Sequence, residues 1–281
     1  MILYTINKLL KYKMRQLDIA VLAPQICALA AKAGDAIMAI YAHADLVQLA
    51  NRADDSPLTR ADLAAHDCIG EGLIGLTPGV PVVSEEDADS WRHLRPDGCF
   101  WLVDPLDGTK EFLARNGEFT VNIALVVDGS PVWGVVHAPA LDQMYWGGLG
   151  YGAKRVNGGD VASIQVVPPS AAGAQCRVVA SKSHLNVETS AFIAQLGATE
   201  LVQAGSSLKF CRVAEGQADV YPRLAPTCEW DTAAAQAVLE GAGGHVVDLQ
   251  GQALRYGKPD LLNPYFIAAT VPLRQLGVDV G

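Results

Sequence analysis

The chain has 281 residues, of which half are hydrophobic and only 18% are charged, so it can bury a sizeable core and is not an intrinsically disordered protein. Its formal net charge of −9 argues against a general affinity for nucleic acid, which requires a basic surface. The negative charge does not exclude a phosphorylated substrate, because bound cations can invert the local sign of a site.

The six cysteines are scattered along the chain without a CxxC pair. This pattern is typical of reduced cysteines in an intracellular protein, so the sequence predicts a cytoplasmic location. No apolar run approaches the roughly 20 residues that a membrane span requires.

The first thirteen residues, MILYTINKLLKYK, mix apolar side chains with three lysines. They lack the longer apolar segment and the cleavage site of a secretory signal. We predict that residues 1–13 are an N-terminal extension outside the fold and that the folded domain begins at Met14. The alternative is a short membrane-surface helix, which would place the protein peripherally at the cytoplasmic face of the inner membrane.

Two helices are predicted next. Asp18 is a suitable N-cap for a helix that continues to about Ala44, with apolar residues at helical spacing. Pro24 would lie inside a helix that began at Asp18, so the first regular turn is predicted just before that proline. After a polar turn, a second helix is expected from about Asp62 to Gly72, with Asp62 capping or opening it.

Carboxylates follow directly after two predicted strands, at residues 81–84 and 100–103. The first strand is followed by Glu85, and the second by Asp104 and Asp107, with a proline between them and a glycine after them. Strands that end in acids at one sheet edge are a suitable layout for a metal site. Acidic turns are the alternative interpretation, since Asp, Pro and Gly are common turn residues.

The middle of the chain predicts an antiparallel meander of strands at residues 119–127, 132–138 and 143–146. The glycine-rich segment 147–154 resembles a phosphate-binding loop, but no Lys-Ser/Thr ending and no helical pattern follow it. We interpret this segment as a connection between strands.

From residue 176 onward strands and helices alternate, which predicts an α/β layer. The expected strands are 176–180, 199–203, 218–221, 245–248 and 266–270, and the expected helices are 187–196, 206–215 and 232–241. Because no linker or repeat separates the halves, we predict one domain over residues 14–281, built of fused subdomains at roughly 14–160 and 161–281.

Asp231 opens the alanine-rich helix of this second half. Together with Asp62, Glu85 and the pair Asp104 and Asp107, it makes four segments in which an acid ends a strand or begins a helix. No Gly-x-Ser-x-Gly elbow, zinc-type spacing or nucleotide fingerprint competes with them. Ligands that are all oxygen atoms favour Mg²⁺ or Mn²⁺ over zinc.

Four motifs, DSPLTRAD (55–62), SEE (84–86), DPLDGT (104–109) and WDTAAA (230–235), occur in this order and at this spacing. They resemble the Mg²⁺-dependent, lithium-sensitive inositol monophosphatase superfamily, from about residue 18 to the C-terminus. The resemblance implies an α/β (α+β layered) sugar-phosphatase fold, a five-layered α-β-α-β-α sandwich of two fused subdomains.

Further motifs resemble one branch of the superfamily, the CysQ-type 3′(2′),5′-bisphosphate nucleotidases. These are DPLDGTKEF (104–112), NGEFTVNIAL (116–125), SKSH (181–184), GSSLKFC (205–211) and DVYPR (219–223). Inositol monophosphatases usually continue the first of these motifs as Thr-Asn-Phe.

The resemblance implies a role for each matching residue. The metal ligands it implies are Glu85, Asp104, the backbone carbonyl of Leu106, Asp107 and Asp231. It implies that Asp62 and Thr109 position and deprotonate the attacking water, with Asp62 as a general base rather than a covalent nucleophile.

Substrate contacts are implied as well. Backbone N–H groups of Gly108 and Thr109 would bind the reacting phosphate, next to Asp231. A second phosphate would be neutralised by Lys209 and Arg223. An adenosine pocket would be lined by Ser183, His184 and Ser206. For the last five residues, an ordinary polar surface position is the alternative.

The activity implied by the resemblance is hydrolysis of 3′-phosphoadenosine 5′-phosphate (PAP) to AMP and phosphate, in sulfur assimilation. Two or three Mg²⁺ ions would serve as cofactors and Li⁺ would inhibit, while nucleic acid is not an expected partner and an oligomer is left open. An inositol-1-phosphate or fructose-1,6-bisphosphate phosphatase of the same superfamily is the nearest alternative. An alternative of another class is a non-catalytic regulatory binding protein on the same fold.

Overall fold

The computed structural model describes residues 17–43, 49–51, 57–169, 175–180 and 186–276. The extension predicted at residues 1–13 lies outside the described residues.

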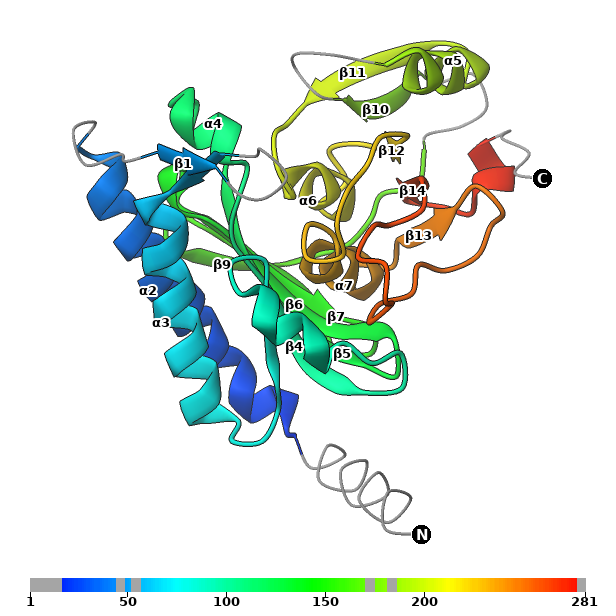
Figure 1. The fold of residues 1–281 in the computed structure, drawn as a ribbon. Helices are drawn as coiled ribbons and strands as arrows, with labels where there is room; N and C mark the ends of the chain where they lie inside the picture. The colour runs from blue at the N-terminus through cyan, green and yellow to red at the C-terminus, as the bar shows by residue number, and fades with distance from the viewer. Residues whose placement is uncertain (1–16, 44–48, 52–56, 170–174, 181–185, 277–281) are drawn as a thin grey trace, which may run out of the picture.

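Five alternating layers of helices and sheets make up the fold (Figure 1). Helices α2 (Ile19–Tyr41) and α3 (Arg60–Leu76) cover one face of a seven-stranded sheet. Helices α6 (Leu208–Ala214) and α7 (Ala233–Gly241) lie between this sheet and a five-stranded sheet, and α5 (Val187–Gln195) covers the outer face of the latter. The predicted five-layered α-β-α-β-α sandwich is therefore confirmed.

The larger sheet follows the order of the chain. Its strands are β3 (Val82–Ser84), β4 (Cys99–Asp107), β5 (Thr120–Val127), β6 (Ser130–Ala138), β7 (Gln143–Gly148), β8 (Gly152–Asn157) and β9 (Asp160–Ile164). β3 and β4 are parallel, and all later neighbours are antiparallel. The predicted meander is confirmed, and it continues through β8 and β9, which the sequence did not predict. The glycine-rich segment connects strands as predicted, because Gly148 pairs with Gly152 across a tight turn.

The smaller sheet has the strand order β11-β10-β12-β14-β13. Its strands are β10 (Cys176–Ala180), β11 (Thr199–Gln203), β12 (Val220–Arg223), β13 (His245–Asp248) and β14 (Phe266–Ala269). Short elements complete the fold: β1 (Leu49–Asn51), β2 (Pro57–Thr59), α4 (Thr109–Leu113), η2 (Ala88–His93), η3 (Pro139–Leu141) and η4 (Leu273–Leu276). The two sheets divide the chain between β9 and β10, while the subdomain boundary near residue 160 stays a prediction.

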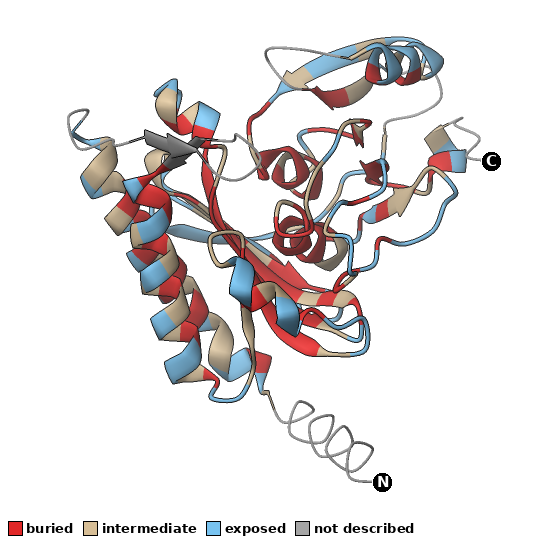
Figure 2. Cartoon of the chain, viewed as in Figure 1, coloured by how far each residue is buried: buried red, intermediate tan, exposed pale blue. Residues whose placement is uncertain are grey.

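Strand β4 is buried on both faces, and Figure 2 shows it in the interior of the molecule. Successive side chains of a strand point to opposite faces. Trp101 and Val103 accordingly pack in the core under α2 and α3, whereas Phe100 and Leu102 pack in the core shared with α6 and α7. Any polar residue at the end of this strand is therefore delivered into a buried environment.

Helix α2 begins at the predicted cap, where Asp18 accepts a hydrogen bond from the backbone N–H of Ala20 at 3.0 Å. The predicted start just before Pro24 was wrong, because the helix continues through that residue with the loss of one backbone hydrogen bond. Among the described helices, only α2 is long and apolar enough to cross a membrane by length and composition. Its buried residues, such as Ile26 and Ile37, pack in the core beneath the larger sheet, as in a core helix.

Candidate active site

Asp104 and Asp107 lie at the end of β4, where the pairing with β5 is irregular. In a regular strand, residues three apart point to opposite faces, so this spacing alone would separate the two carboxylates. Pro105 has no N–H to donate to the ladder, and the register shifts between the two acids. Gly108 then adopts φ +90°, a conformation that favours glycine, and the chain turns into α4. The irregular strand end thus allows both acids to face one pocket.

Glu85 joins this group from the neighbouring strand. Because β3 and β4 run in parallel with Ser84 opposite Val103, Glu85, which directly follows β3, reaches the level of Asp104. The backbone N–H of Glu85 donates to the carbonyl of Val103 at 3.2 Å.

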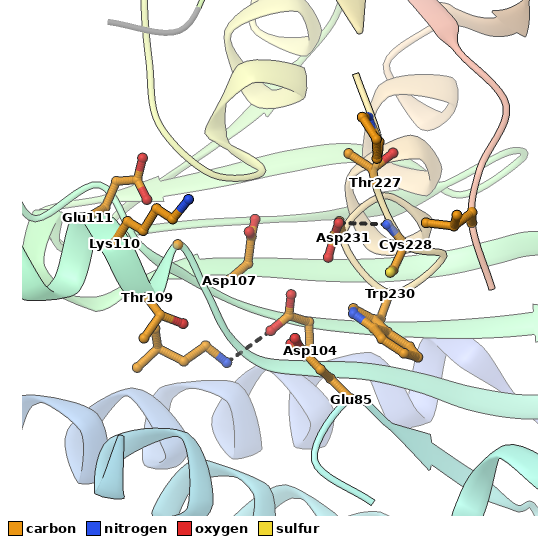
Figure 3. A pocket seen from close by; sticks show the side chains of 14 residues that line it. Glu85, Asp104, Asp107, Thr109, Lys110, Glu111, Thr227, Cys228, Trp230 and Asp231 are labelled. Carbon is orange, nitrogen blue, oxygen red and sulfur yellow. Dashed lines mark hydrogen bonds between the residues drawn. The ribbon is translucent and has the colours of Figure 1, made fainter. Parts of the chain in front are cut away.

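Asp231 arrives from the second half of the chain, just before α7. Its Oδ2 accepts a hydrogen bond from the backbone N–H of Cys228 at 2.8 Å. Carboxylate oxygens of Asp104, Asp107 and Asp231 all lie within 4.8 Å of one another, and Figure 3 shows the three side chains converging. We call these three residues the acid cluster.

The electrostatics of the acid cluster fit a divalent cation. Burial raises the pKa of Asp104 well above its ordinary value, and the charges of Glu85, Asp107 and Asp231 raise it further. Burial, followed by the charge of Asp107, raises the pKa of Asp231 to about 7. Carboxylates this close cannot all ionise without a compensating positive charge. Because the donors are all oxygen atoms, the residues present suit Mg²⁺.

Asp62 and Thr109 are also brought together. The Thr109 hydroxyl lies 3.4 Å from Asp62 Oδ1, and both residues are buried. Asp62 Oδ2 accepts from the backbone N–H of Thr59 at 2.8 Å and from its hydroxyl at 2.6 Å. Asp62 is thus the N3 residue of a capping box, in which Thr59 is the N-cap. The same carboxylate both stabilises the start of α3 and reaches Thr109.

Two basic side chains lie behind the acid cluster. Lys209 is buried and donates from Nζ to the carbonyl of Ser206 at 2.8 Å. Burial lowers the pKa of Lys209, against the opposing effect of Asp107. Arg223 donates to the carbonyl of Pro226 at 2.8 Å. The positive charges of Arg223 and Lys209 oppose the rise in the pKa of Asp231.

The remaining predicted substrate residues are only partly placed. Leu106, Gly108 and Thr109 line the pocket beside the acids. Ser206 contacts Asp107 rather than the pocket, with its hydroxyl 2.5 Å from Oδ2. Ser183 and His184 lie outside the described residues.

The pocket has a volume of about 440 Å³, and several of its lining residues were not predicted as site residues. These are Lys110, Glu111, Pro226, Thr227, Cys228, Trp230 and Leu262 (Figure 3). Most of them flank the DPLDGT and WDTAAA motifs, so their proximity to a motif was the available signal. Leu262 had no such signal, because it reaches the site from a distant loop.

Residues 18–277 match the model of the inositol monophosphatase family. The chain belongs to this family. Among its members, the 3′(2′),5′-bisphosphate nucleotidase CysQ of Salmonella typhimurium is 51% identical over 246 residues, which cover 86% of this chain and 97% of that protein. The corresponding protein of Escherichia coli K12 is 50% identical with the same coverage.

Solved structures of the inositol monophosphatase family share the fold. The crystal structure of CysQ from Bacteroides thetaiotaomicron is 43% identical, with a TM-score of 0.76 over 91% of this chain and 99% of that chain. An inositol monophosphatase from Thermotoga maritima is 24% identical, with a TM-score of 0.71 over 93% of this chain and 94% of that chain. The latter similarity concerns the fold alone.

Proposed function

We propose that this protein is a Mg²⁺-dependent 3′(2′),5′-bisphosphate nucleotidase that hydrolyses PAP to AMP and phosphate. The proposal rests on one observation above all: about half of the residues are identical to proteins named as this nucleotidase, over 97% of their length. The acid cluster and its pocket are the features that such a phosphatase requires.

The proposed metal ligands are the acids that converge on the pocket, with one backbone carbonyl. Glu85, Asp107 and Asp231 would hold the ions together with Asp104 and the carbonyl of Leu106, and we propose two or three Mg²⁺ ions per site. When bound, such ions neutralise charge on phosphate oxygens and lower the pKa of water, which supplies a nucleophile near neutral pH. We also propose that Li⁺ inhibits the enzyme.

Asp62 and Thr109 would orient the attacking water. The hydroxyl of Thr109 and Oδ1 of Asp62 are 3.4 Å apart, so one water can contact both, and Asp62 accepts its proton as a general base. The water oxygen forms a bond to phosphorus while the bond to the 3′ oxygen of the ribose breaks, and that oxygen leaves with a proton.

The substrate would be held by groups on either side of the acids. Backbone N–H groups of Gly108 and Thr109 would bind the reacting phosphate. Lys209 and Arg223 would offset the charge of the second phosphate from behind the acid cluster. Ser183, His184 and Ser206 stay predicted adenosine contacts.

Steady-state phosphate release tests the proposed substrate. PAP, its sulfated relative PAPS, inositol-1-phosphate and fructose-1,6-bisphosphate should be compared in Mg²⁺, with and without Li⁺. We expect PAP to have the highest kcat/KM. A strong preference for inositol-1-phosphate would overturn the substrate assignment, and no turnover of any substrate would favour a non-catalytic protein.

Asp107→Asn tests the metal assignment separately, with Asp97→Asn as its matched control because Asp97 is exposed. We expect Mg²⁺-dependent turnover to be lost in the first variant and retained in the second. Unchanged turnover in Asp107→Asn would refute the assignment of the ligands.

The proposed location is the cytoplasm. A peripheral association with the membrane through residues 1–13 is a separate hypothesis. This hypothesis predicts that deleting residues 1–13 reduces binding to anionic lipid vesicles. Unchanged binding would refute the hypothesis.

A further inference from the structure

One member of the acid cluster, Asp107, belongs to a closed ring of polar contacts. The ring has five side chains, those of Asp107, Ser206, Thr120, Asn122 and Ser207. Ser206 Oγ lies 2.5 Å from Asp107 Oδ2 and 2.6 Å from Thr120 Oγ1. Thr120 Oγ1 lies 3.0 Å from Asn122 Oδ1, and Asn122 Nδ2 donates to Ser207 Oγ at 2.9 Å. Ser207 Oγ closes the ring at 3.0 Å from Asp107 Oδ2.

The ring occupies positions where the sequence pattern calls for apolar side chains. On β5, Val121, Ile123 and Leu125 pack under α2 and α3, so Thr120 and Asn122 point to the opposite, inner face. Both are buried, with 0% and 1% of their surface exposed. A buried polar side chain lowers stability unless it forms hydrogen bonds, so their presence here calls for a specific role.

Strand pairing sets these two residues directly beside the acids. Thr120 is opposite Asp107 and Asn122 is opposite Asp104 in the ladder between β4 and β5. Thr120 and Asn122 belong to the NGEFTVNIAL motif, to which the proposed chemistry gives no function.

The protons of the ring can be assigned from the chemistry of its members. An ionised carboxylate only accepts hydrogen bonds, so Ser206 donates to Asp107. Thr120 has a single hydroxyl proton, which it shares between Ser206 Oγ and Asn122 Oδ1. A second arm runs from Asn122 to Ser207, whose hydroxyl faces Asp107 Oδ2 and also the backbone carbonyl of Asp231 at 2.8 Å.

Ser207 therefore contacts two members of the acid cluster that come from opposite halves of the chain. The preceding residue, Ser206, has φ +49°, a left-handed conformation that is uncommon for serine. Such a conformation is energetically unfavourable and persists only where surrounding contacts hold it. The hydrogen bonds to Asp107 and Thr120 are contacts of this kind.

We propose that Thr120, Asn122 and Ser207 are positioning residues that hold the carboxylate of Asp107 in one orientation and at a set distance from Asp231. The hydroxyl groups of Ser206 and Ser207 both approach Oδ2 of Asp107, which leaves its Oδ1 for a cation. The acid cluster is thereby shaped before any ion binds. This inference rests on the proposed role of Asp107 as a metal ligand.

The test compares two variants at one position with a control elsewhere. Thr120→Val removes the hydroxyl and keeps the shape, whereas Thr120→Ser keeps the hydroxyl. Thr77→Val is the matched control, because Thr77 is equally buried and its hydroxyl bonds Leu73 and Trp101 in the core under α2 and α3. The readouts are the Mg²⁺ dissociation constant by titration calorimetry, the unfolding temperature in EDTA, and kcat and KM for PAP.

Thr120→Val should weaken Mg²⁺ binding by about 10-fold, the lower end of the range for loss of a group that supports a metal ligand, because Thr120 acts on Asp107 through Ser206. Its kcat should fall with it, and Thr120→Ser should restore both values. Thr77→Val should lower the unfolding temperature and leave Mg²⁺ binding unchanged. If Thr120→Val does not fold, Ser207→Ala decides the question by the same measurements.

The wild-type protein separates this inference from the proposed function. If it neither binds Mg²⁺ nor hydrolyses PAP, the proposed function fails. If it does both while Thr120→Val or Ser207→Ala binds Mg²⁺ with wild-type affinity, only the positioning role is wrong. An equal loss of Mg²⁺ affinity in Thr77→Val would likewise overturn it, because the effect would then be one of general stability.

Discussion

Among the described residues outside the site, three acids have almost fully buried side chains, but each of them meets a basic side chain. These pairs are Glu215 with Arg155 and Arg212, Asp219 with Arg177, and Glu229 with Lys258, at N–O distances of 2.5–2.6 Å. In the acid cluster, by contrast, the charges that act most strongly on Asp104 are those of other carboxylates.

The two groups of acids differ in where the compensating charge comes from. A buried carboxylate is tolerated when it is paired and hydrogen-bonded, and the structural acids have their cations built into the chain. At the acid cluster the charges of Arg223 and Lys209 oppose the rise in the pKa of Asp231, and the proposed Mg²⁺ ions would supply the remaining positive charge. This difference distinguishes the proposed metal site from an ion pair that holds the fold together.

The Glu215 group shows what the paired acids do. Arg155 lies on β8, Arg212 on α6, and the hydroxyl of Tyr145 on β7 is 3.2 Å from Glu215 Oε2. These contacts attach the last turn of α6 to the larger sheet. Ser207, which contacts the acid cluster, directly precedes the same helix.

The largest expected effect that tests the contrast between paired and unpaired acids is that of Asp104→Asn. We expect Mg²⁺-dependent turnover to fall by more than about 100-fold, beyond the usual range for a residue that only supports a ligand. The same change should raise the unfolding temperature in EDTA at alkaline pH, because it removes a carboxyl group whose ionised form is opposed by burial and by the neighbouring carboxylates. A variant that is less stable in EDTA would contradict the view that these acids are uncompensated.

Glu215→Gln should have the opposite pattern. Removing the charge leaves Arg155 and Arg212 without their partner, which should lower the free energy of unfolding by about 3 kcal/mol. Chemical denaturation measures this loss, and the Mg²⁺ dissociation constant of the folded variant should stay unchanged. A large change in Mg²⁺ affinity would show that the two groups of acids are not independent.

The smallest effect is a dependence of stability on pH. Because the pKa of Asp231 is raised from 3.8 to about 7, the folded metal-free protein binds more protons than the unfolded chain within this window. The contribution of Asp231 to the stability of the folded state is therefore fully present below about pH 4 and is lost as the pH rises through about 7.

Unfolding in EDTA across this pH range checks the sign. The stability of the wild type relative to Asp231→Asn should decrease as the pH rises from about 4 to about 7. Saturating Mg²⁺ should abolish the decrease, since the cation binds the ionised form. A relative stability that rises with pH in EDTA would mean that Asp231 has a compensating charge in the metal-free protein.

Local patterns in the sequence predicted most of the fold. The apolar strand that runs into Asp104, the alternation of strands and helices after residue 176, and the cap at Asp18 depend on near neighbours. The missed strands β8 and β9 are exposed over most of their length, so they lack the apolar alternation that marks a strand. The start of α2 was misplaced because proline is tolerated in this helix interior.

The sequence alone determined which residue types the site contains. Acids at the ends of strands and helices, combined in recognisable motifs, predicted the ligand chemistry and correctly indicated the family. It also established Asp62 and Thr109 as a predicted pair, 47 residues apart in the chain.

Only the tertiary structure decided how these groups meet. A spacing of three residues on a strand would separate Asp104 and Asp107, and the irregular pairing with β5 brings them together. The contacts of Thr120 and Asn122 with Ser206 and Ser207 join segments more than 80 residues apart. No local periodicity encodes such contacts, because they arise from the packing of one sheet against a helix of the other half.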